Sequence, residues 1–186
     1  MGAERKVAVM VGSLSDLKQC LAGLATLRDA SDHGTIELLG NMILVSSIHR
    51  ATEVTLQQIR TYHELEQPPD VLIAGAGWAN HLTGMCDAYL RYALQDTKIV
   101  VVGVAFEDPS NEFHTMAARL SITEVPGNQV VFSDGQSNFI GANGFLRACR
   151  FAISGQLPVI TLPDPRPPKA LTLDKAIEIA TMSEYE

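Results

Sequence analysis

The stretch KVAVMVGSLSDLKQC, residues 6–20, decides the fold, because a short apolar run in it passes through a turn into helical spacing. Residues 6–11 lack the polar and apolar alternation of a half-exposed strand, so we expect a strand buried on both faces. The apolar side chains that follow recur on one helix face, and they are Leu17, Cys20, Leu21, Leu24 and Leu27. A buried strand followed by an amphipathic helix is the repeating unit of a parallel sheet.

The same unit repeats along the chain. Runs rich in valine and isoleucine predict further strands at residues 36–46, 70–74, 98–104 and 129–133. Amphipathic segments lie between most of these runs. The alternation predicts a three-layer α/β fold, flavodoxin-like or Rossmann-like, with a parallel sheet of about five strands and helices on both faces. In such folds ligands bind beyond the carboxyl ends of the strands.

The amino-acid composition of the sequence changes near Pro158. The stretch LPVITLPDPRPPKAL, residues 157–171, is too rich in proline to continue a helix or a central strand. Beyond it, Leu173, Ile177 and Ala180 return at helical spacing. We therefore expect an α/β domain over residues 1–157, then a proline-rich arm and terminal helix over residues 158–186 that pack on their own or a neighbouring subunit.

Composition limits the classes of partner. The chain has 186 residues, 46% of them hydrophobic, and a formal net charge of -7. This charge argues against nonspecific binding to nucleic acid or to an anionic membrane, although a local pocket can still attract an anion. The cysteines, Cys20, Cys86 and Cys149, are isolated in apolar surroundings and are expected in the core. Because no signal peptide or long apolar stretch is visible, we expect a cytoplasmic protein.

The turn after the first predicted strand reads VGSLSD and contains Gly12, Ser13, Ser15 and Asp16. Backbone amide groups at the start of the following helix can hold a phosphate. The alternative is an ordinary turn in which a serine or the aspartate caps the helix.

The second predicted strand ends in SSIHRATE, residues 46–53. His49 can move a proton near neutral pH, and Arg50 offers a fork of donors for phosphate or carboxylate. Ser47 precedes them in the same turn. Both charged groups would stand at the edge of the sheet where ligands bind.

The third predicted strand ends in AGAGWANHLTGM, residues 74–85. Gly75 and Gly77 permit close approach of a ligand, but the spacing of a dinucleotide fingerprint is missing, so a nicotinamide site is rejected. His81 either packs at the helix entrance or enters a pocket. Trp78 either covers a planar ligand or fills a gap in the interior, and we favour the gap. The other histidines, His33, His63 and His114, are expected at the surface.

Together the three turns suit a phosphorylated, polar, planar substrate and a proton transfer. His49 and His81 have no carboxylate or thiolate at metal-ligand spacing, so no metal site is predicted. No nucleophile elbow or Ser-His-acid order supports acyl transfer.

These motifs resemble those of the aminoimidazole ribonucleotide carboxylase family, which includes N5-carboxyaminoimidazole ribonucleotide mutase of purine synthesis. The family patterns are Gly-Ser-x-Ser-Asp, Ser-Ala-His-Arg and Ala-Gly-Ala-Gly-Gly-Ala-Ala-His-Leu-Pro-Gly-Met, and the similarity extends over about residues 7–153. The resemblance implies a flavodoxin-like subunit, an octamer, and catalysis without metal or organic cofactor. It also implies that a carboxylate moves from an exocyclic nitrogen to a ring carbon through carbon dioxide held in the pocket.

The resemblance also assigns roles to residues. Ser13, Ser15 and Asp16 would bind phosphate and ribose, Arg50 would grip the phosphate, and His49 would act first as acid and then as base. His81 would act beside it as a second catalytic group, and the carbon dioxide pocket would be shaped by the third turn. The remaining substrate-binding positions are Gly12, Ser47, Gly75, Ala76, Gly77, Ala79 and Leu82.

Several positions depart from the family patterns. Ile48 and Asn80 replace alanines, Trp78 replaces a glycine and Thr83 a proline, which could reshape the pocket. A Gly-Val-Asp-Ser-Leu element is missing at residues 115–119, and residues 86–98 are longer than expected. A direct carboxylase branch, typically with lysine after the first histidine, no second histidine and asparagine in the third loop, is one alternative. Two others are a paralogue acting on another carboxylated nucleotide and a nucleotide-binding module without catalysis.

Overall fold

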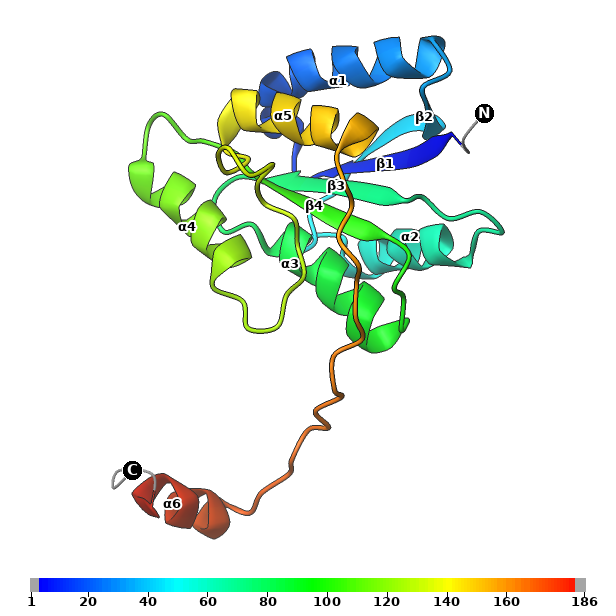
Figure 1. The fold of residues 1–186 in the computed structure, drawn as a ribbon. Helices are drawn as coiled ribbons and strands as arrows, with labels where there is room; N and C mark the ends of the chain where they lie inside the picture. The colour runs from blue at the N-terminus through cyan, green and yellow to red at the C-terminus, as the bar shows by residue number, and fades with distance from the viewer. Residues whose placement is uncertain (1–3, 183–186) are drawn as a thin grey trace.

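The structure is a computed structural model in which residues 4–182 are described. Its centre is a four-stranded parallel sheet in the order β2-β1-β3-β4 (Figure 1). The strands are β1 (Arg5–Val11), β2 (Ile36–Val45), β3 (Val71–Ala76) and β4 (Val100–Ala105). This order matches the flavodoxin-like arrangement and confirms the predicted fold class.

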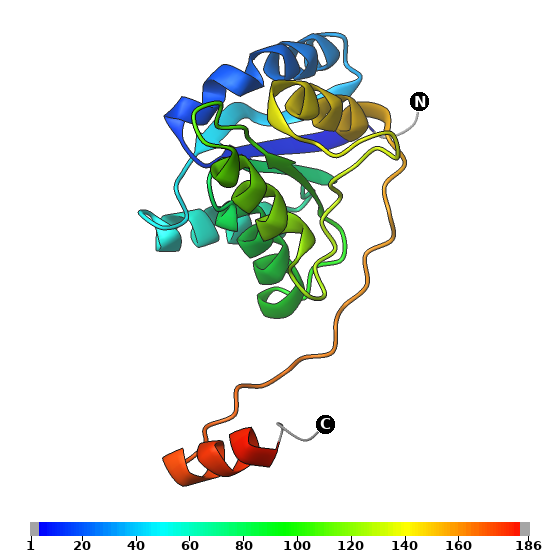
Figure 2. The same cartoon turned by 90° about the vertical axis from the view of Figure 1, so that its left-hand side faces the viewer.

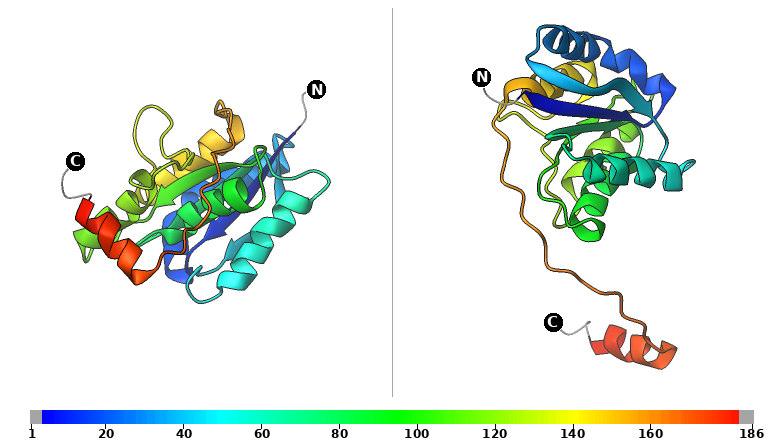
Figure 3. Two further views of the ribbon diagram at one scale, coloured as in Figure 1. Left: turned by 90° about the horizontal axis from the view of Figure 1, so that it is seen from below. Right: turned by 90° about the vertical axis from the view of Figure 1, so that its right-hand side faces the viewer.

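Helices cover both faces of the sheet (Figures 1 and 3). On one face lie α1 (Leu17–Asp32) and α5 (Gly141–Ser154), and on the other lie α2 (Thr52–Glu64) and α3 (His81–Ala88). A π-helical turn, η2 (Tyr89–Ala93), extends α3, and α4 (Glu112–Thr123) contacts α3 and β4. A short 3-10 turn, η1 (Leu14–Asp16), precedes α1.

The alternation of side chains along β1 explains the three layers. Val7, Val9 and Val11 pack in the core cluster that contains residues of α1 and α5. Ala8 and Met10 point the other way, into the cluster that contains residues of α2 and α3. Because successive strand residues face opposite sides, a strand between two helix layers needs apolar residues at every position.

The expected fifth strand at residues 129–133 is not present as a strand. Val131 makes one parallel bridge to Val102, and its amide donates to the Val101 carbonyl at 2.9 Å. The preceding amides are used by side chains, since Gln129 N–H donates to Asp87 Oδ2 at 2.9 Å and Val130 N–H to Asn128 Oδ1 at 3.0 Å. The segment therefore lies against β4 but cannot extend a ladder along it.

The C-terminal arm begins on the body of the domain and then leaves it. Ile160 is buried, and Gln129 accepts from Thr161 N–H at 2.9 Å while its amide donates to the Thr161 carbonyl at 2.6 Å. Farther on, the chain runs to α6 (Leu173–Met182), which has no buried residues and stands apart from the sheet and its helices (Figures 1 and 2). Within residues 4–182, no helix has the length and apolar character needed to span a membrane.

Candidate active site

The turns after β1, β2 and β3 meet at one edge of the sheet. These strands are parallel neighbours, so their carboxyl ends share that edge. The turns enclose a cavity of about 470 Å³. It is lined by Gly12, Ser13, Ser15, Asp16, Ser47, Ile48, His49, Arg50, Ala76, Gly77, Trp78, Ala79, His81 and Leu82. Of the site residues named from the sequence, Gly75 does not line it; it lies in β3, and its carbonyl accepts from Gly12 N–H at 2.9 Å.

Glycine is required where the first and third turns touch. A Cβ on Gly12 would lie 2.7 Å from Ala76 Cβ, and a Cβ on Gly75 would lie 2.8 Å from the Phe106 ring. Both distances are shorter than a carbon contact allows. Gly12 therefore lets the first turn approach the third, and Gly75 leaves room for the Phe106 ring against β3.

Asp16 joins the same two turns through its carboxylate. Ser13 Oγ donates to Asp16 Oδ2 at 2.9 Å, the Gly77 N–H also donates to this carboxylate, and Ser13 Oγ lies 2.7 Å from Ser15 Oγ. Burial raises the pKa of Asp16 above its usual range, and the bonds from Ser13 and Gly77 oppose that shift. Neither Ser13 nor Asp16 caps a helix with its side chain, so this is not the ordinary capped turn considered above.

The two histidines of the cavity are hydrogen-bonded to each other. His81 Nδ1 lies 2.7 Å from His49 Nε2, and the ring centroids are 4.7 Å apart with the planes tilted by 56°. One of these nitrogens must carry the proton and the other must accept it. The pair can therefore hold one shared proton, but a second proton between the rings would break the bond.

The side chains of Asn80 and Thr83 fix the start of α3, the helix whose first residue is His81. The Asn80 side chain caps α3 by accepting from Thr83 N–H at 3.1 Å, and its amide donates to the Val104 carbonyl at 2.8 Å. Thr83 Oγ1 donates to the Ala74 carbonyl at 2.8 Å. Asn80 and Thr83, two of the departures from the family patterns, are thus buried polar residues with hydrogen-bond partners, and neither lines the cavity.

Arg50 supplies a positive charge at the cavity. Its side chain is exposed, and it makes no hydrogen bond or ion pair with any side chain or carbonyl in the described part of the chain. An uncompensated guanidinium beside the amides of the first turn suits a doubly charged phosphate.

Trp78 does not fill an interior gap, and that expectation is wrong. Its side chain is 64% exposed and lines the cavity, and its backbone has φ of 55°. The indole stacks on His114, with ring centroids 3.9 Å apart and planes 18° from parallel.

His63 and His114 are half-buried rather than on the surface, since each ring bonds to an aspartate, Asp96 and Asp108 respectively. No local pattern marks His114 as part of the site, because Trp78, on which it stacks, lies far away in the sequence.

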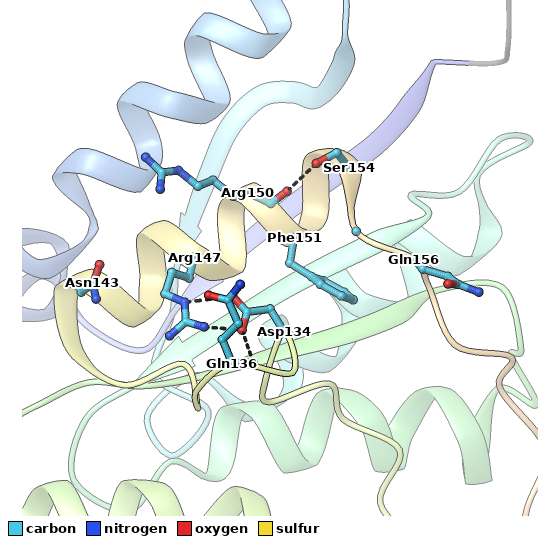
Figure 4. Close-up of a pocket in the computed structure, with 9 residues that line it drawn as sticks. Asp134, Gln136, Asn143, Arg147, Arg150, Phe151, Ser154 and Gln156 are labelled. Atoms are coloured by element: carbon cyan, nitrogen blue, oxygen red, sulfur yellow. Dashed lines mark hydrogen bonds and ion pairs between the residues drawn. The ribbon is translucent and has the colours of Figure 1, made fainter.

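A second cavity, of about 620 Å³, lies along α5 and the segment before it (Figure 4). Arg147, one of the two arginines that line it, is neutralised by an ion pair with Asp134. Arg150 extends away from that pair (Figure 4). Among residues 4–182, no cluster of three or more histidine, cysteine, aspartate or glutamate side chains is placed to hold a metal ion.

Comparison with known proteins agrees with this geometry. The family model described as AIR carboxylase matches residues 6–138. Two crystal structures from Treponema denticola share the fold: PurE, with 15% sequence identity and a TM-score of 0.53, and a PurE2 variant, with 14% and 0.55. Each alignment covers 97% of this chain and 94% of the other. Among curated proteins no sequence matches. Because the family model spans most of the α/β domain and includes all three turns, the chain belongs to the AIR carboxylase family of enzymes, with a role in the carboxylate mutase or carboxylase chemistry of purine biosynthesis.

Proposed function

We propose that this enzyme is a mutase that moves a carboxylate from the exocyclic nitrogen to the ring carbon of carboxyaminoimidazole ribonucleotide. The observation that carries the proposal is the 2.7 Å hydrogen bond between His49 and His81 in a cavity that also holds the unpaired Arg50 guanidinium. One group can move a proton while the other fixes an anion.

The substrate would be held by its phosphate and ribose. The guanidinium of Arg50, the hydroxyls of Ser13 and Ser15, and the amides of the first turn would bind the phosphate. Asp16 would accept hydrogen bonds from ribose hydroxyls, and Ser47 faces the same cavity. With the phosphate and ribose held in this way, the imidazole ring would lie beside the histidines of the same cavity.

The reaction requires one proton to be given and one to be taken. When the bond between the exocyclic nitrogen and the carboxylate carbon breaks, carbon dioxide leaves and the electron pair stays on nitrogen, which takes a proton from His49. The electron-rich ring carbon then attacks carbon dioxide, and His49 removes the proton from that carbon. The net proton change is zero, which suits a histidine pair that holds one shared proton.

Carbon dioxide must stay near the ring between the two steps. We assign its retention to the third turn, where Ala76, Gly77 and Ala79 line the cavity with small residues and Leu82 adds an apolar wall. Gly75 supports this turn from β3 and not from the cavity surface.

A direct carboxylase is the main alternative, and an asparagine in the third turn, such as Asn80, is typical of that branch. The Asn80 amide is buried and both of its groups are bonded within the domain, so it lends that reaction no contact with substrate. Arg50 and His81 favour the mutase. A paralogue with another heterocyclic nucleotide is supported by one observation, the presence of the Trp78 indole in the cavity wall.

The test follows ultraviolet absorbance with purified full-length protein and two substrates. We expect carboxyaminoimidazole ribonucleotide to be converted without added bicarbonate, and aminoimidazole ribonucleotide with bicarbonate to react much more slowly. The reverse order would assign a direct carboxylase. Thermal stabilisation by either nucleotide without turnover would indicate a binding module, and neither binding nor turnover would indicate a different nucleotide.

A further inference from the structure

The Trp78 indole is held in an unusual position. A non-glycine residue with φ of 55° is disfavoured and persists only when its surroundings fix it. Its large apolar side chain is also left 64% exposed at the cavity. A strained backbone that presents a tryptophan to a cavity needs a physical cause.

The cause on the domain side is His114, which backs the indole at 3.9 Å. Both ring nitrogens of His114 are occupied: Nδ1 lies 2.7 Å from Asp108 Oδ2, and Nε2 lies 3.2 Å from Asn111 Nδ2. Asn111 Oδ1 is already used, because it accepts from Phe113 N–H at 3.0 Å. Nε2 therefore accepts from the Asn111 amide and Nδ1 donates to Asp108, which fixes the tautomer and the plane of the ring.

Asp108 remains a reliable acceptor for this ring. Hydrogen bonds from His114 and from Ser110 lower the pKa of Asp108 to about 2. The carboxylate is thus ionised at any pH near neutrality, and His114 keeps its orientation as long as the bond is present. A ring fixed at both nitrogens is a rigid support for the indole above it.

We propose that Trp78, backed by His114, is a stacking platform for the planar base of the phosphorylated riboside that this site binds. The inference rests on the proposed function and adds to it a residue that selects the substrate. His114 does not line the cavity, whereas Trp78 does, so the indole is the surface that this stack offers to a ligand. Any heteroaromatic base can stack on such a surface, because each has a π face.

The position agrees with the rest of the site. Arg50 and the first turn take the phosphate, and the indole belongs to the third turn, next to the histidine pair. A base stacked on Trp78 would therefore lie beside the groups that move protons. The indole therefore selects ligands with a flat, delocalised ring. A ligand with the same sugar phosphate but no base would lack the stacking contact with Trp78.

Intrinsic fluorescence reports the contact directly, because Trp78 is the single tryptophan of the chain. With the full-length protein, we expect aminoimidazole ribonucleotide to change the Trp78 emission on titration. Ribose 5-phosphate, which carries the phosphate without a base, should bind by calorimetry and leave the emission unchanged. Bound aminoimidazole ribonucleotide with unchanged emission would overturn the platform and leave the proposed function intact.

Two substitutions separate stacking from bulk. Trp78→Leu should lower the affinity for aminoimidazole ribonucleotide about tenfold and the affinity for ribose 5-phosphate less than about twofold. Trp78→Phe should keep most of the affinity of the unmodified protein. If Trp78→Leu lowered the affinity for both ligands equally, or left both affinities unchanged, the stacking platform would be overturned. Absence of binding by both ligands to the unmodified protein would overturn the proposed function, and the platform with it.

His114 is a positioning residue in this scheme, and its test needs a readout beyond affinity. His114→Leu should lower the fluorescence anisotropy of Trp78 in the free protein, because the indole loses its support. His33→Leu changes an exposed histidine outside the cavity and serves as the control. Anisotropy that is the same in all three proteins would show that His114 does not fix the indole.

Discussion

The Asp16 carboxylate lies half-buried between the first and third turns, where it serves both the fold and the cavity. Burial raises its pKa in the folded protein above the usual 3.8, in spite of the bonds from Ser13 and Gly77. A raised carboxyl pKa means that the folded state binds the proton more tightly than the unfolded state. Stability is therefore lost as pH rises from the unfolded pKa through the folded one.

Replacing Asp16→Asn should accordingly raise the melting temperature at pH 7 while weakening aminoimidazole ribonucleotide binding. The gain in melting temperature should shrink as pH falls toward 4, because the native carboxyl then becomes neutral on its own. Thermal unfolding between pH 4 and pH 8 measures the first effect, and calorimetry measures the second. A variant less stable at pH 7 would show that the bonds from Ser13 and Gly77 outweigh the desolvation of the carboxylate.

Gly12 gives a second test at the scale of one residue. Gly12→Ala should destabilise the domain by about 1–3 kcal/mol, because the new methyl group would meet Ala76. Gly84→Ala is the matched control: its nearest neighbour, the Ser121 carbonyl oxygen, would be 3.8 Å away, and alanine suits the interior of α3. We expect that control to stabilise by about 0.5–1 kcal/mol. Equal effects in denaturant unfolding would contradict the close approach at Gly12.

At the scale of elements, α3 carries His81 of the site at its first residue and Asp87 of a buried ion network near its last. Arg91, in the π-helical turn, is fully buried and donates to Asp87 Oδ1 at 3.1 Å and to the carbonyls of Asp96 and Ile99 at 2.5 Å. Asp87 in turn accepts from Gln129 N–H. This network explains the extra length of residues 86–98, since the turn carries the guanidinium back beneath the start of β4.

Arg91→Met should lower the free energy of unfolding by about 3–5 kcal/mol, because Asp87 would remain buried without its cation. Arg119→Met, at an exposed arginine of α4, should change it by less than about 0.5 kcal/mol. Chemical denaturation of the two variants provides the comparison. A small loss for Arg91→Met would show that the buried pair adds little beyond its hydrogen bonds.

The elements differ in how far the sequence could predict them. The strands at residues 6–11, 70–74 and 98–104 were predictable, because burial on both faces demands an unbroken apolar run. Residues 129–133 also contain an apolar run, but Asp87 takes the Gln129 amide that a ladder would need, and that contact is not visible locally. The π-helical turn has no signal of its own in the sequence, because Tyr89 and Tyr92 also fit the spacing of an α-helix.

At the scale of the whole molecule, the meeting of the three turns was predictable because parallel neighbouring strands place their following turns at one edge. His49, Arg50 and Asp16 could be assigned to that edge before any contact was known. The stack of Trp78 on His114 could not, since it depends on how α4 sits beside the third turn. Fold topology sets which turns meet, and side-chain packing sets what each group touches.

The C-terminal arm makes a prediction about assembly. α6 has 10 residues, and its Leu173, Ile177 and Met182 side chains are 76%, 56% and 67% exposed. A helix this short is marginal alone, so we propose that it packs on a neighbouring subunit of a homo-oligomer. Light scattering of a chain ending at Leu162, which keeps Ile160 and Thr161 in place, should give a smaller assembly than the full chain. Identical masses would contradict this role of α6.

Proton transfer by His49 is tested most directly by the turnover of carboxyaminoimidazole ribonucleotide at saturating concentration, compared between the wild type and His49→Asn. The variant leaves Arg50 and the first turn unchanged, so substrate affinity should be retained within a few-fold. We expect turnover to fall by about 10²–10⁴-fold, the range of a general acid–base contribution. Turnover within about tenfold of the wild type, with the substrate still bound, would contradict the role of His49 in moving the proton.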